Sequence, residues 1–386
     1  MGVHKTGSIF SLIMLVTAQT VLAQKVPPPP EMKLEALPLR SVDPDDNVST
    51  PAKVELGRLL FFDPILSATK KVACATCHHP DYGWADGRAT PLGVGGKGIG
   101  PRRLPVKTEG IGILVRNTPG LLNVAFNGLV SGQDYDPKKA PMFLDTRESG
   151  LEAQLFHPIR MQAEMRGNDC PESQAVERMV ARVSGVDEYR KKFAKVFFEE
   201  KPEGKEGEVT AGKVAAVIAA FERSLLANNA PFDRFMRGDK MALTAQQLRG
   251  LKTYEKAGCV HCHGGPMFSD FKLHFIDVTG TGRDDRQAMR TPTLRNLRYT
   301  APYLHHGRKR TLDEVMVFYE KLMDAAAEVI DGGAETDPPF DPLLKHLHLE
   351  AEDFEDVLAF LDALNDETWD KRVPERVPSG LKVGGE

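Results

Sequence analysis

The sequence has little of what a nucleic-acid-binding or membrane-embedded protein needs. Its 386 residues carry 50 Lys and Arg against 54 Asp and Glu, a formal net charge of −4, which gives no strong attraction to nucleic acid or to an anionic membrane. No apolar run approaches the roughly twenty residues that span a bilayer, and alternating strand patterns are sparse. We therefore expect a mainly α-helical protein with long loops and little β structure, with no nucleic-acid partner and no membrane span in the mature chain.

One short apolar run lies at the N-terminus. Ile9 to Val16 is almost unbroken, it follows Lys5, and small residues lead up to Ala23 and Gln24. A basic start, a short apolar centre and small residues at the cleavage position are typical of a secretory signal peptide. We expect residues 1–23 to be removed and the mature protein to be exported to the periplasm. A retained N-terminal anchor is the alternative.

Composition divides the rest of the chain. Residues 24–50 are rich in proline and charge and should form an extended lead-in segment. The remaining length suits two domains, an N-terminal one over 51–235 and a C-terminal one over 236–386. A helix rich in Ala, Val and Leu over 211–229 is expected to join them.

Local signals place two further helices. Thr50-Pro51 begins a helix with proline at its first position, and this helix should end before Asp63. Thr244 and Gln247 form a capping box for a helix that runs to Lys256 and stops at Gly258. A late amphipathic helix is expected over 353–364.

Each of these two capped helices is followed by a tight pair of cysteines. The chain has five cysteines, and four of them lie in Cys74-Ala75-Thr76-Cys77-His78 and Cys259-Val260-His261-Cys262-His263. Both segments match C-x-x-C-H, the attachment motif of c-type haem. Two thiols at this spacing can form thioethers with the two vinyl groups of one porphyrin, and the adjacent histidine becomes the proximal iron ligand.

The alternatives for these motifs are a zinc knuckle and a redox dithiol. A zinc site needs two more ligands for each pair, and a dithiol does not need the histidine. Two such motifs behind a signal peptide therefore favour two covalently bound haem c groups. Cys170 is left over, and no role is assigned to it.

With both motifs placed, the chain resembles the bacterial di-haem cytochrome c peroxidase and MauG superfamily. The resemblance extends over nearly all of the mature chain and implies two cytochrome-c-like haem domains. It is carried by five segments in this order: Leu60–Pro64, Arg116–Pro119, Leu122–Asn123, Arg290–Asn296 and Ala301–Tyr303.

The resemblance implies that 51–235 is the peroxidatic domain, with its haem on His78. It also implies that 236–386 is the electron-transfer domain, with its haem on His263. Gln154, Pro158 and Glu164 fall where the family has its peroxide-pocket residues. Glu164 is then the candidate acid/base, which moves a proton between the two oxygens of bound peroxide. Without the resemblance, Glu164 would be read as a solvated helix residue.

Relatives that need reductive activation have a histidine in the loop after the first haem. Here neither the glycine-rich loop, Gly93 to Gly100, nor the residues up to Arg116 contain one. The resemblance therefore implies a first haem iron that is open or water-bound at rest.

For the second haem, the resemblance places the distal ligand on a helix after His305. Counting along the chain reaches Tyr319, which would favour ferric iron, while Met316 and Met323 lie about one turn to either side. The family also implies that Arg290 lies near the haems, where it can pair with a propionate.

The family further implies a calcium ion between the haems. Asn117, Thr300 and Pro302 match its ligands, an asparagine side chain and two backbone carbonyls, and such oxygen ligands suit calcium.

Two positions depart from the family pattern. Relatives have a tryptophan between the haems where this chain has Leu144, which cannot carry an electron hole. Trp84 is a possible substitute, although its place after the first motif favours packing. His157 stands where relatives often have glycine, either inside the peroxide pocket or at the surface.

The leading hypothesis is an enzyme that reacts with hydrogen peroxide. Its electrons would come from a small donor protein, a cytochrome c or a cupredoxin, or its oxidising equivalents would act on a protein substrate. The alternative is a di-haem electron carrier or redox sensor without peroxide turnover.

Overall fold

The computed structural model describes residues 1–2, 32–198, 208–276, 287–331 and 340–386. The expected signal peptide and the first part of the proline-rich segment lie outside the described residues. None of the helices in the described ranges is both long enough and apolar enough to cross a membrane.

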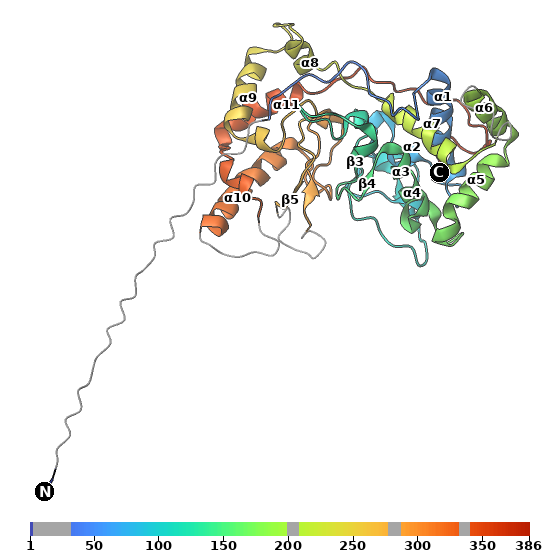
Figure 1. The fold of residues 1–386 in the computed structure, drawn as a ribbon, viewed down its shortest axis with the longest axis horizontal. Coiled ribbons are helices and arrows are strands. Elements are labelled where there is room, and N and C mark those ends of the chain that lie inside the picture. The colour runs from blue at the N-terminus through green and yellow to red at the C-terminus, as the bar shows by residue number, and fades with distance from the viewer. Residues whose placement is uncertain (3–31, 199–207, 277–286, 332–339) are drawn as a thin grey trace.

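Helices dominate the first half of the chain (Figure 1). Thr50 caps the first long helix through its side chain, which accepts a hydrogen bond from Lys53 N at 3.2 Å, as the sequence predicts. This helix packs closely against a later one, and shorter helices surround the pair. The helices of this half are α1 (Pro51–Phe62), α2 (Cys74–Cys77), α3 (Leu151–Gln154), α4 (Phe156–Arg160), α5 (Ala175–Ser184), α6 (Asp187–Phe197) and α7 (Ala211–Arg223).

The helix expected over 211–229 is shorter than predicted. It ends at Arg223, where Ser224 Oγ donates to Phe221 O at 2.6 Å and replaces the continuing helical bond. Residues 224–230 then cross to the second half as extended chain, so the connection is made by this segment and not by the helix.

The second half contains α8 (Pro231–Met236), α9 (Ala245–Lys256), α10 (Leu312–Asp331) and α11 (Phe354–Asp362). The predicted capping box is confirmed, because Thr244 N donates to Gln247 Oε1 at 2.9 Å and Gln247 N to Thr244 Oγ1 at 3.2 Å. Gly258 has a φ of +80° and stops α9, as expected. Helix α9 packs against α11.

Strands are few and short among the described residues. Each of three antiparallel pairs joins two residues to two: β1 (Gly96–Lys97) with β2 (Leu104–Pro105), β3 (Pro141–Met142) with β4 (Glu148–Ser149), and β5 (Leu273–His274) with β6 (Met289–Arg290). The mainly helical fold with little β structure is therefore confirmed.

Apolar side chains form two large clusters, one in each half. One includes Phe61, Trp84 and Phe221, and the other includes Tyr254, Phe268 and Phe360. The division of the chain at residue 235 is compatible with these clusters and stays a prediction.

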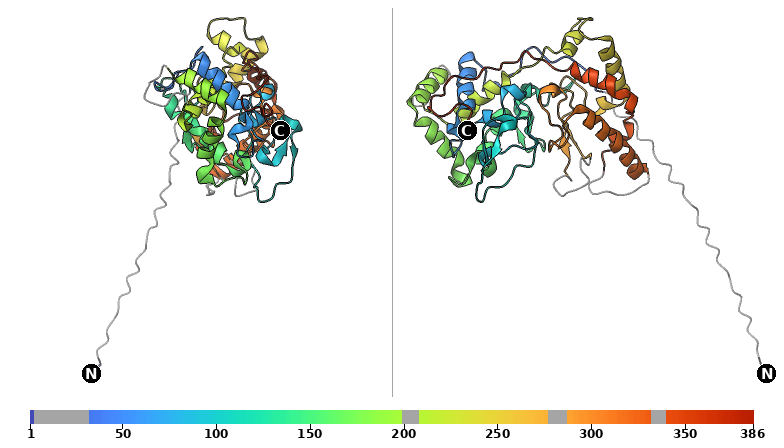
Figure 2. Two further views of the ribbon diagram at one scale, coloured as in Figure 1. Left: turned by 90° about the vertical axis from the view of Figure 1, so that its right-hand side faces the viewer. Right: turned by 180° about the vertical axis from the view of Figure 1, so that it is seen from behind.

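Both ends of the described chain run between the two halves (Figure 2). The N-terminal segment 32–50 starts in the second half, where Leu37 N donates to Asp233 Oδ1 at 2.9 Å. It ends at α1. The C-terminal segment returns from α11 to the first half, where Ser379 Oγ donates to Asp63 Oδ1 at 2.6 Å and Thr76 Oγ1 to Gly384 O at 2.7 Å.

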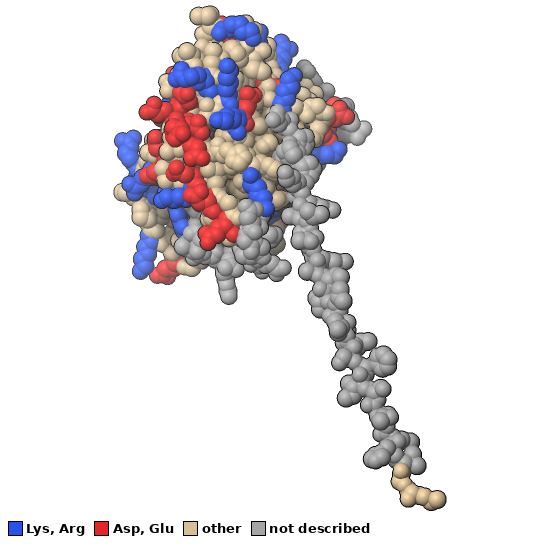
Figure 3. Space-filling view, turned by 90° about the vertical axis from the view of Figure 1, so that its left-hand side faces the viewer, with Lys and Arg blue, Asp and Glu red and all other residues tan. Residues whose placement is uncertain are grey.

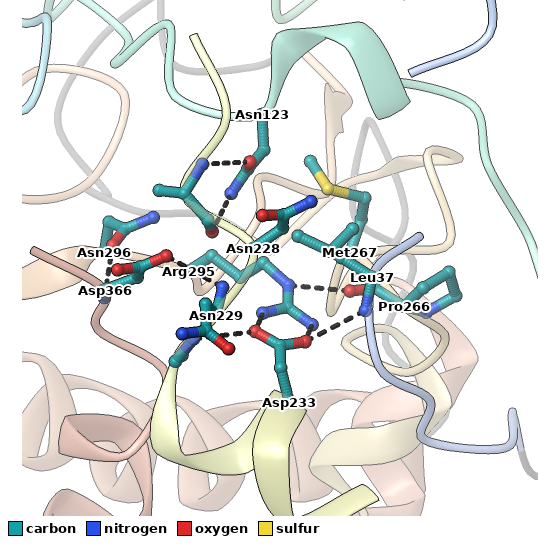
Figure 4. Close-up of polar contacts among 12 residues, drawn as sticks. Leu37, Asn123, Asn228, Asn229, Asp233, Pro266, Met267, Arg295, Asn296 and Asp366 are labelled. Atoms are coloured by element: carbon teal, nitrogen blue, oxygen red, sulfur yellow. Dashed lines mark hydrogen bonds and ion pairs between the residues drawn. The ribbon is translucent and has the colours of Figure 1, made fainter. Parts of the chain in front are cut away.

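A buried ion pair lies where these segments meet (Figure 4). The guanidinium of Arg295 donates to both carboxylate oxygens of Asp233, at 2.9 and 3.0 Å, and to Pro266 O at 2.7 Å. Nearby, Asn123 Nδ2 donates to Ala227 O at 2.8 Å. These polar contacts fix the segments around Asn123 and Arg295 at the junction of the two halves.

Candidate functional site

The two C-x-x-C-H segments have the same local geometry. His78 N donates to Cys74 O at 2.9 Å, and His263 N donates to Cys259 O at 2.8 Å. Nδ1 of His78 lies 2.9 Å from Trp84 O, and Nδ1 of His263 lies 3.0 Å from Phe268 O. A carbonyl can only accept, so Nδ1 carries the proton in both rings and Nε2 is left to bind a metal. This is the arrangement that a proximal haem ligand requires.

The cysteines do not fit the alternatives. None of the five forms a disulfide, and burial raises the pKa of Cys77, Cys259 and Cys262 to about 12. A redox dithiol needs a low thiol pKa. Among the described residues, no three His, Cys, Asp or Glu side chains gather in a way that could hold a metal ion, which a zinc knuckle would require.

The cysteine and histidine side chains of both motifs are only partly exposed. Cys74, Cys77 and His78 keep accessible surface, although burial is the main cause of their shifted pKa values. The same holds for Cys259, Cys262 and His263. These side chains are therefore enclosed by the protein yet still partly accessible, as attachment of a haem through two thioethers requires.

Glu164 lies beside the first motif. It sits in a single turn of π-helix, Gln162–Arg166, and its charge raises the pKa of Cys77. Burial raises the pKa of Glu164 itself, while Arg147 and His157 oppose the shift. A half-buried carboxyl with a raised pKa beside the motif is suited to accept and to donate a proton.

The glycine-rich loop closes over this turn. Gly93 has a φ of +47°, and a Cβ there would lie 2.0 Å from Ala163 O. Only glycine permits this approach. Gln154 ends α3 and Pro158 lies in α4, the short helix that packs against the Glu164 turn. The structure thus gathers the three predicted pocket residues on consecutive turns.

The segment in front of this pocket also meets the second half. His157 Nε2 lies 2.9 Å from Glu148 Oε2, and its ring packs edge-on against Phe143. Arg290 N donates to Leu144 O at 2.6 Å, and Arg290 Nε donates to Phe143 O at 3.1 Å. Leu144 therefore occupies the boundary between the halves, as its position in the sequence predicts.

Arg290 is a buried cation without a carboxylate. It is 8% exposed, burial lowers its pKa to about 10, and in the described part of the chain it makes no ion pair. An unpaired buried guanidinium is costly. The carboxylate of a haem propionate would relieve that cost.

Sequence reasoning missed Arg103. Its guanidinium is 2% exposed and donates to the backbone oxygens of Gly93, Gly98 and Glu386. It lies close enough to Cys77 to affect the pKa of that thiol. The sequence feature that could have drawn attention to Arg103 is a pair of arginines directly after the glycine-rich loop.

Glu222 on α7 was also missed. It is 7% exposed, burial raises its pKa to about 8, and its charge raises the pKa of Cys74. It therefore lies near the first motif. In the sequence it looks like one more residue of an alanine-rich helix.

Tyr319 faces the second motif. Burial, and then the thiols of Cys262 and Cys259, raise the pKa of Tyr319. Met316 and Met323 are three residues before and four after it on α10, so all three share one helix face, and all three pack at the same apolar cluster. The structure brings the three candidates together, and the choice of Tyr319 stays a prediction.

A charged cluster lies beside the second motif. His274 Nε2 is 2.9 Å from Asp270 Oδ2, and Nδ1 is 2.6 Å from Asp341 Oδ2. These hydrogen bonds raise the pKa of His274 to about 9 against the effect of burial. The imidazolium joins β5 to the segment before Pro342.

The predicted calcium ligands come from two loops that touch. Asn117 N donates to His305 O at 2.8 Å, and Asn117 Nδ2 donates to Arg88 O at 2.7 Å, which leaves Oδ1 as the remaining acceptor. A Cβ at Gly120 would lie 3.1 Å from Thr300 Cγ2. Asn117 and the Thr300–Pro302 segment thus lie near one another, and calcium stays a prediction.

Comparisons with known proteins agree with this site. Residues 51–241 match the di-haem cytochrome c peroxidase family. The methylamine utilization protein MauG of Methylorubrum extorquens is 33% identical over 84% of this chain and 81% of its own. The cytochrome-c peroxidase IdrP1 of Pseudomonas sp. strain SCT is 30% identical over 92% of this chain and 90% of its own.

Solved structures show the same fold. The crystal structure of a MauG-like protein associated with microbial copper homeostasis has a TM-score of 0.60 and 25% identity, and covers 91% of this chain and 97% of its own. Two proximal-type histidines with paired cysteines, the matching family and these relatives lead to one conclusion. The chain belongs to the di-haem cytochrome c peroxidase and MauG family of oxidoreductases, and two haem c groups are its cofactors.

Proposed function

We propose that this protein is a periplasmic peroxidase that reacts with hydrogen peroxide at the first haem, on His78, and exchanges electrons through the second, on His263. The observation that carries the proposal is the placement of Glu164 beside Cys77, with its pKa raised by burial. When bound, the haem supplies an iron that binds peroxide and changes its oxidation state. The protein supplies the orientation and the proton transfers.

His78 and Glu164 divide this work. The hydrogen bond from His78 Nδ1 to Trp84 O, 2.9 Å long, holds the imidazole in one tautomer and one orientation. Glu164 takes the proton from the near oxygen of hydrogen peroxide and returns it to the far oxygen, which leaves as water. Gln154 and Pro158 complete the pocket wall.

Resting reactivity follows from the loop over the pocket. Residues 93–116 contain no histidine, so this loop offers no sixth imidazole ligand. His79, the nearest alternative in sequence, accepts a hydrogen bond from Asp81 N at 3.3 Å through Nδ1, and His157 is paired with Glu148. These residues would therefore leave a first haem open to peroxide without prior reduction.

The second half serves electron exchange. Tyr319 would be the distal ligand of the second haem, Arg290 would pair with a propionate, and Asn117, Thr300 and Pro302 would hold calcium. Figure 3 shows a band of acidic side chains over the outer face of this half. Exposed acids on its elements include Asp313, Glu314, Glu352 and Glu355. A small electron-donor protein with a basic surface, such as a cytochrome c, would complement this face.

The test is the haem absorption spectrum of the ferric holo-protein after about one equivalent of peroxide. A prompt change that decays faster with an electron donor supports the proposal. A change only after one-electron reduction would mean that a sixth ligand closes the first iron. No change in either state would overturn the peroxidase and leave a di-haem electron carrier.

A further inference from the structure

The two tryptophans of the chain lie in the same apolar cluster at the first haem site, and a tyrosine packs against it. Trp84 is fully buried and Trp369 is 5% exposed. Tyr299 is half-buried and belongs to the second half of the chain. Its ring centroid lies 4.7 Å from that of Trp369, in an edge-on contact.

Tyr299 is linked to His78 by a short route. The carbonyl of Trp84 accepts the hydrogen bond from His78 Nδ1 at 2.9 Å. Gly83 precedes Trp84, and a Cβ at Gly83 would lie 2.9 Å from Cβ of Tyr299. One hydrogen bond, two residues of backbone and the close approach of Gly83 to Tyr299 therefore connect the proximal ligand to this residue.

The hydroxyl of Tyr299 has a base that can take its proton. Oη donates to Glu367 Oε1 at 2.7 Å, and Glu367 is exposed at the surface. A phenol that loses an electron becomes strongly acidic, so it is oxidised readily only where a base is hydrogen-bonded to it. A carboxylate can take that proton, whereas a backbone carbonyl cannot.

Other described tyrosines lack this combination. The hydroxyls of three of them donate to backbone carbonyls: Tyr135, Tyr254 and Tyr303. Tyr189 donates to Asp63 Oδ2 at 2.7 Å, but its side chain is fully buried and out of reach of an external electron donor.

The tryptophans are poorer places for an electron hole. Nε1 of Trp84 and Nε1 of Trp369 are buried without a hydrogen-bond partner in the described structure. Lys371 Nζ lies 4.3 Å from the centre of the Trp369 ring, and its positive charge opposes a second one on that ring. Of these three rings, Tyr299 is the one with a hydrogen-bonded base for its proton, and that base, Glu367, also pairs with Arg298 at 3.2 Å.

We propose that Tyr299 is a redox-active residue that carries oxidising equivalents from the first haem to the protein surface. The proposal rests on the peroxide reaction proposed above, with hydrogen peroxide as the oxidant. Tyr299 gives one electron to the oxidised haem centre, which is reduced by one electron, and its phenolic proton passes to Glu367. A one-electron donor at the surface then returns the electron, and Glu367 returns the proton. This route does not pass through Leu144 at the boundary between the two halves, because it leaves the first haem on its proximal side.

The experiment is freeze-quench electron paramagnetic resonance of the holo-protein, at a series of times after one equivalent of hydrogen peroxide. Wild type should give a tyrosyl radical signal that is absent in Tyr299→Phe and reduced in yield in Glu367→Gln. Tyr135→Phe is the matched control, because this half-buried tyrosine donates to the carbonyl of Ala125, and it should keep the signal. In wild type alone, a nitroso spin trap followed by peptide mapping should label Tyr299.

The haem absorption spectrum recorded on the same samples separates two failures. A haem change with no tyrosyl signal, or with a signal that survives in Tyr299→Phe, overturns the role of Tyr299 and leaves the peroxidase standing. No haem change in wild type overturns the peroxide reaction and, with it, the role of Tyr299. The role of Tyr299 is also overturned if Tyr135→Phe loses the signal and the spin trap labels a residue other than Tyr299.

Discussion

Two carboxyl groups whose pKa burial raises lie near the first haem motif, and they differ in their surroundings. Glu164 lies near Cys77, and the positive charges of Arg147 and His157 partly offset the effect of burial on its pKa. Glu222 lies near Cys74, where Arg223 offsets burial less, and its pKa is raised to about 8. Carboxyls in different environments take different roles in one site. Glu164, on the turn under the glycine-rich loop, is the one suited to proton transfer with peroxide.

Replacing Glu164 by glutamine should slow the reaction with peroxide about 10²- to 10⁴-fold, the usual contribution of a positioned acid/base. The rate in wild type should stay high above the pKa of Glu164 and decline as the pH falls through it, because the protonated acid cannot accept the first proton. Burial raises this pKa, so the decline occurs at higher pH than for an ordinary glutamate.

Stopped-flow absorption across a pH series measures both effects. Glu172→Gln changes an exposed glutamate of the same half and should match wild type. An unchanged rate in Glu164→Gln, or an inflection that persists in it, would exclude Glu164 as the acid/base.

The distal ligand of the second haem is a second prediction at this scale. Tyr319→Phe should change the absorption spectrum of one haem only. It should also raise the reduction potential of that haem, because an anionic oxygen ligand stabilises ferric iron. Met316→Leu and Met323→Leu are the matched controls on the same helix face and should leave the spectrum unchanged. A spectral change in either methionine variant and none in Tyr319→Phe would assign the ligand to that methionine.

At the scale of elements, each long helix before a haem motif crosses its partner at a glycine. A Cβ at Gly57 of α1 would lie 1.9 Å from Val217 O of α7, and a Cβ at Gly250 of α9 would lie 1.8 Å from Asp356 O of α11. The backbones therefore approach more closely than any other residue permits.

Gly57→Ala should destabilise the protein, since the helices must separate to admit a methyl group. The expected cost is about 1–3 kcal/mol for overpacking, which exceeds the gain of about 1 kcal/mol in helix propensity. Urea unfolding of the holo-protein measures the difference in free energy. Gly212→Ala in α7 is the control, because a Cβ there meets nothing within 4 Å, and it should stabilise slightly. Equal stability of the two variants would contradict the close crossing.

Elements whose signals are local were predictable from the sequence, and contacts between distant residues were not. The starts at Thr50 and Thr244 and the stop at Gly258 each depend on residues within one helical turn. The attachment motifs are equally local. The predicted helix over 211–229 was too long, since α7 ends at Arg223. Alanine and leucine favour helix, but they do not mark where tertiary packing ends it.

The residues of the site also divide into those that were predicted from the sequence and those that were not. Glu164, Arg290 and Tyr319 were found through the resemblance and not through any pattern of their own. Arg103 and Glu222 were missed because their importance lies in burial beside Cys77 and Cys74, which comes from packing between segments far apart in the chain.

At the scale of the whole molecule, segments near both ends of the chain run between the two halves, and a buried ion pair of the second half anchors the first of these segments. Arg295 and Asp233 are 1% and 0% exposed, and Asp233 also accepts from Leu37 N and Ala230 N. One aspartate thus fixes the lead-in segment, the start of α8 and the loop after the second motif. The position of the lead-in segment against the second half therefore depends on this aspartate.

Asp233→Asn should cost about 3–5 kcal/mol of unfolding free energy, because it leaves the guanidinium of Arg295 buried without its counter-charge. Asp356→Asn is the control, since Asp356 pairs with Arg249 at the surface, where such a pair contributes at most about 1 kcal/mol. Urea titration followed by circular dichroism compares the two. A loss in Asp233→Asn no larger than in Asp356→Asn would show that the junction does not depend on this charge.

The returning C-terminal segment also bears on the order in which the molecule is assembled. Thr76, inside the first haem motif, donates to the carbonyl of Gly384, 308 positions later, and Gly385 pairs with Val72 just before the motif. A chain made from its N-terminus presents the first cysteine pair long before these residues exist. That pair therefore stays open on one side until residues 384–385, more than 300 positions later, pack against it.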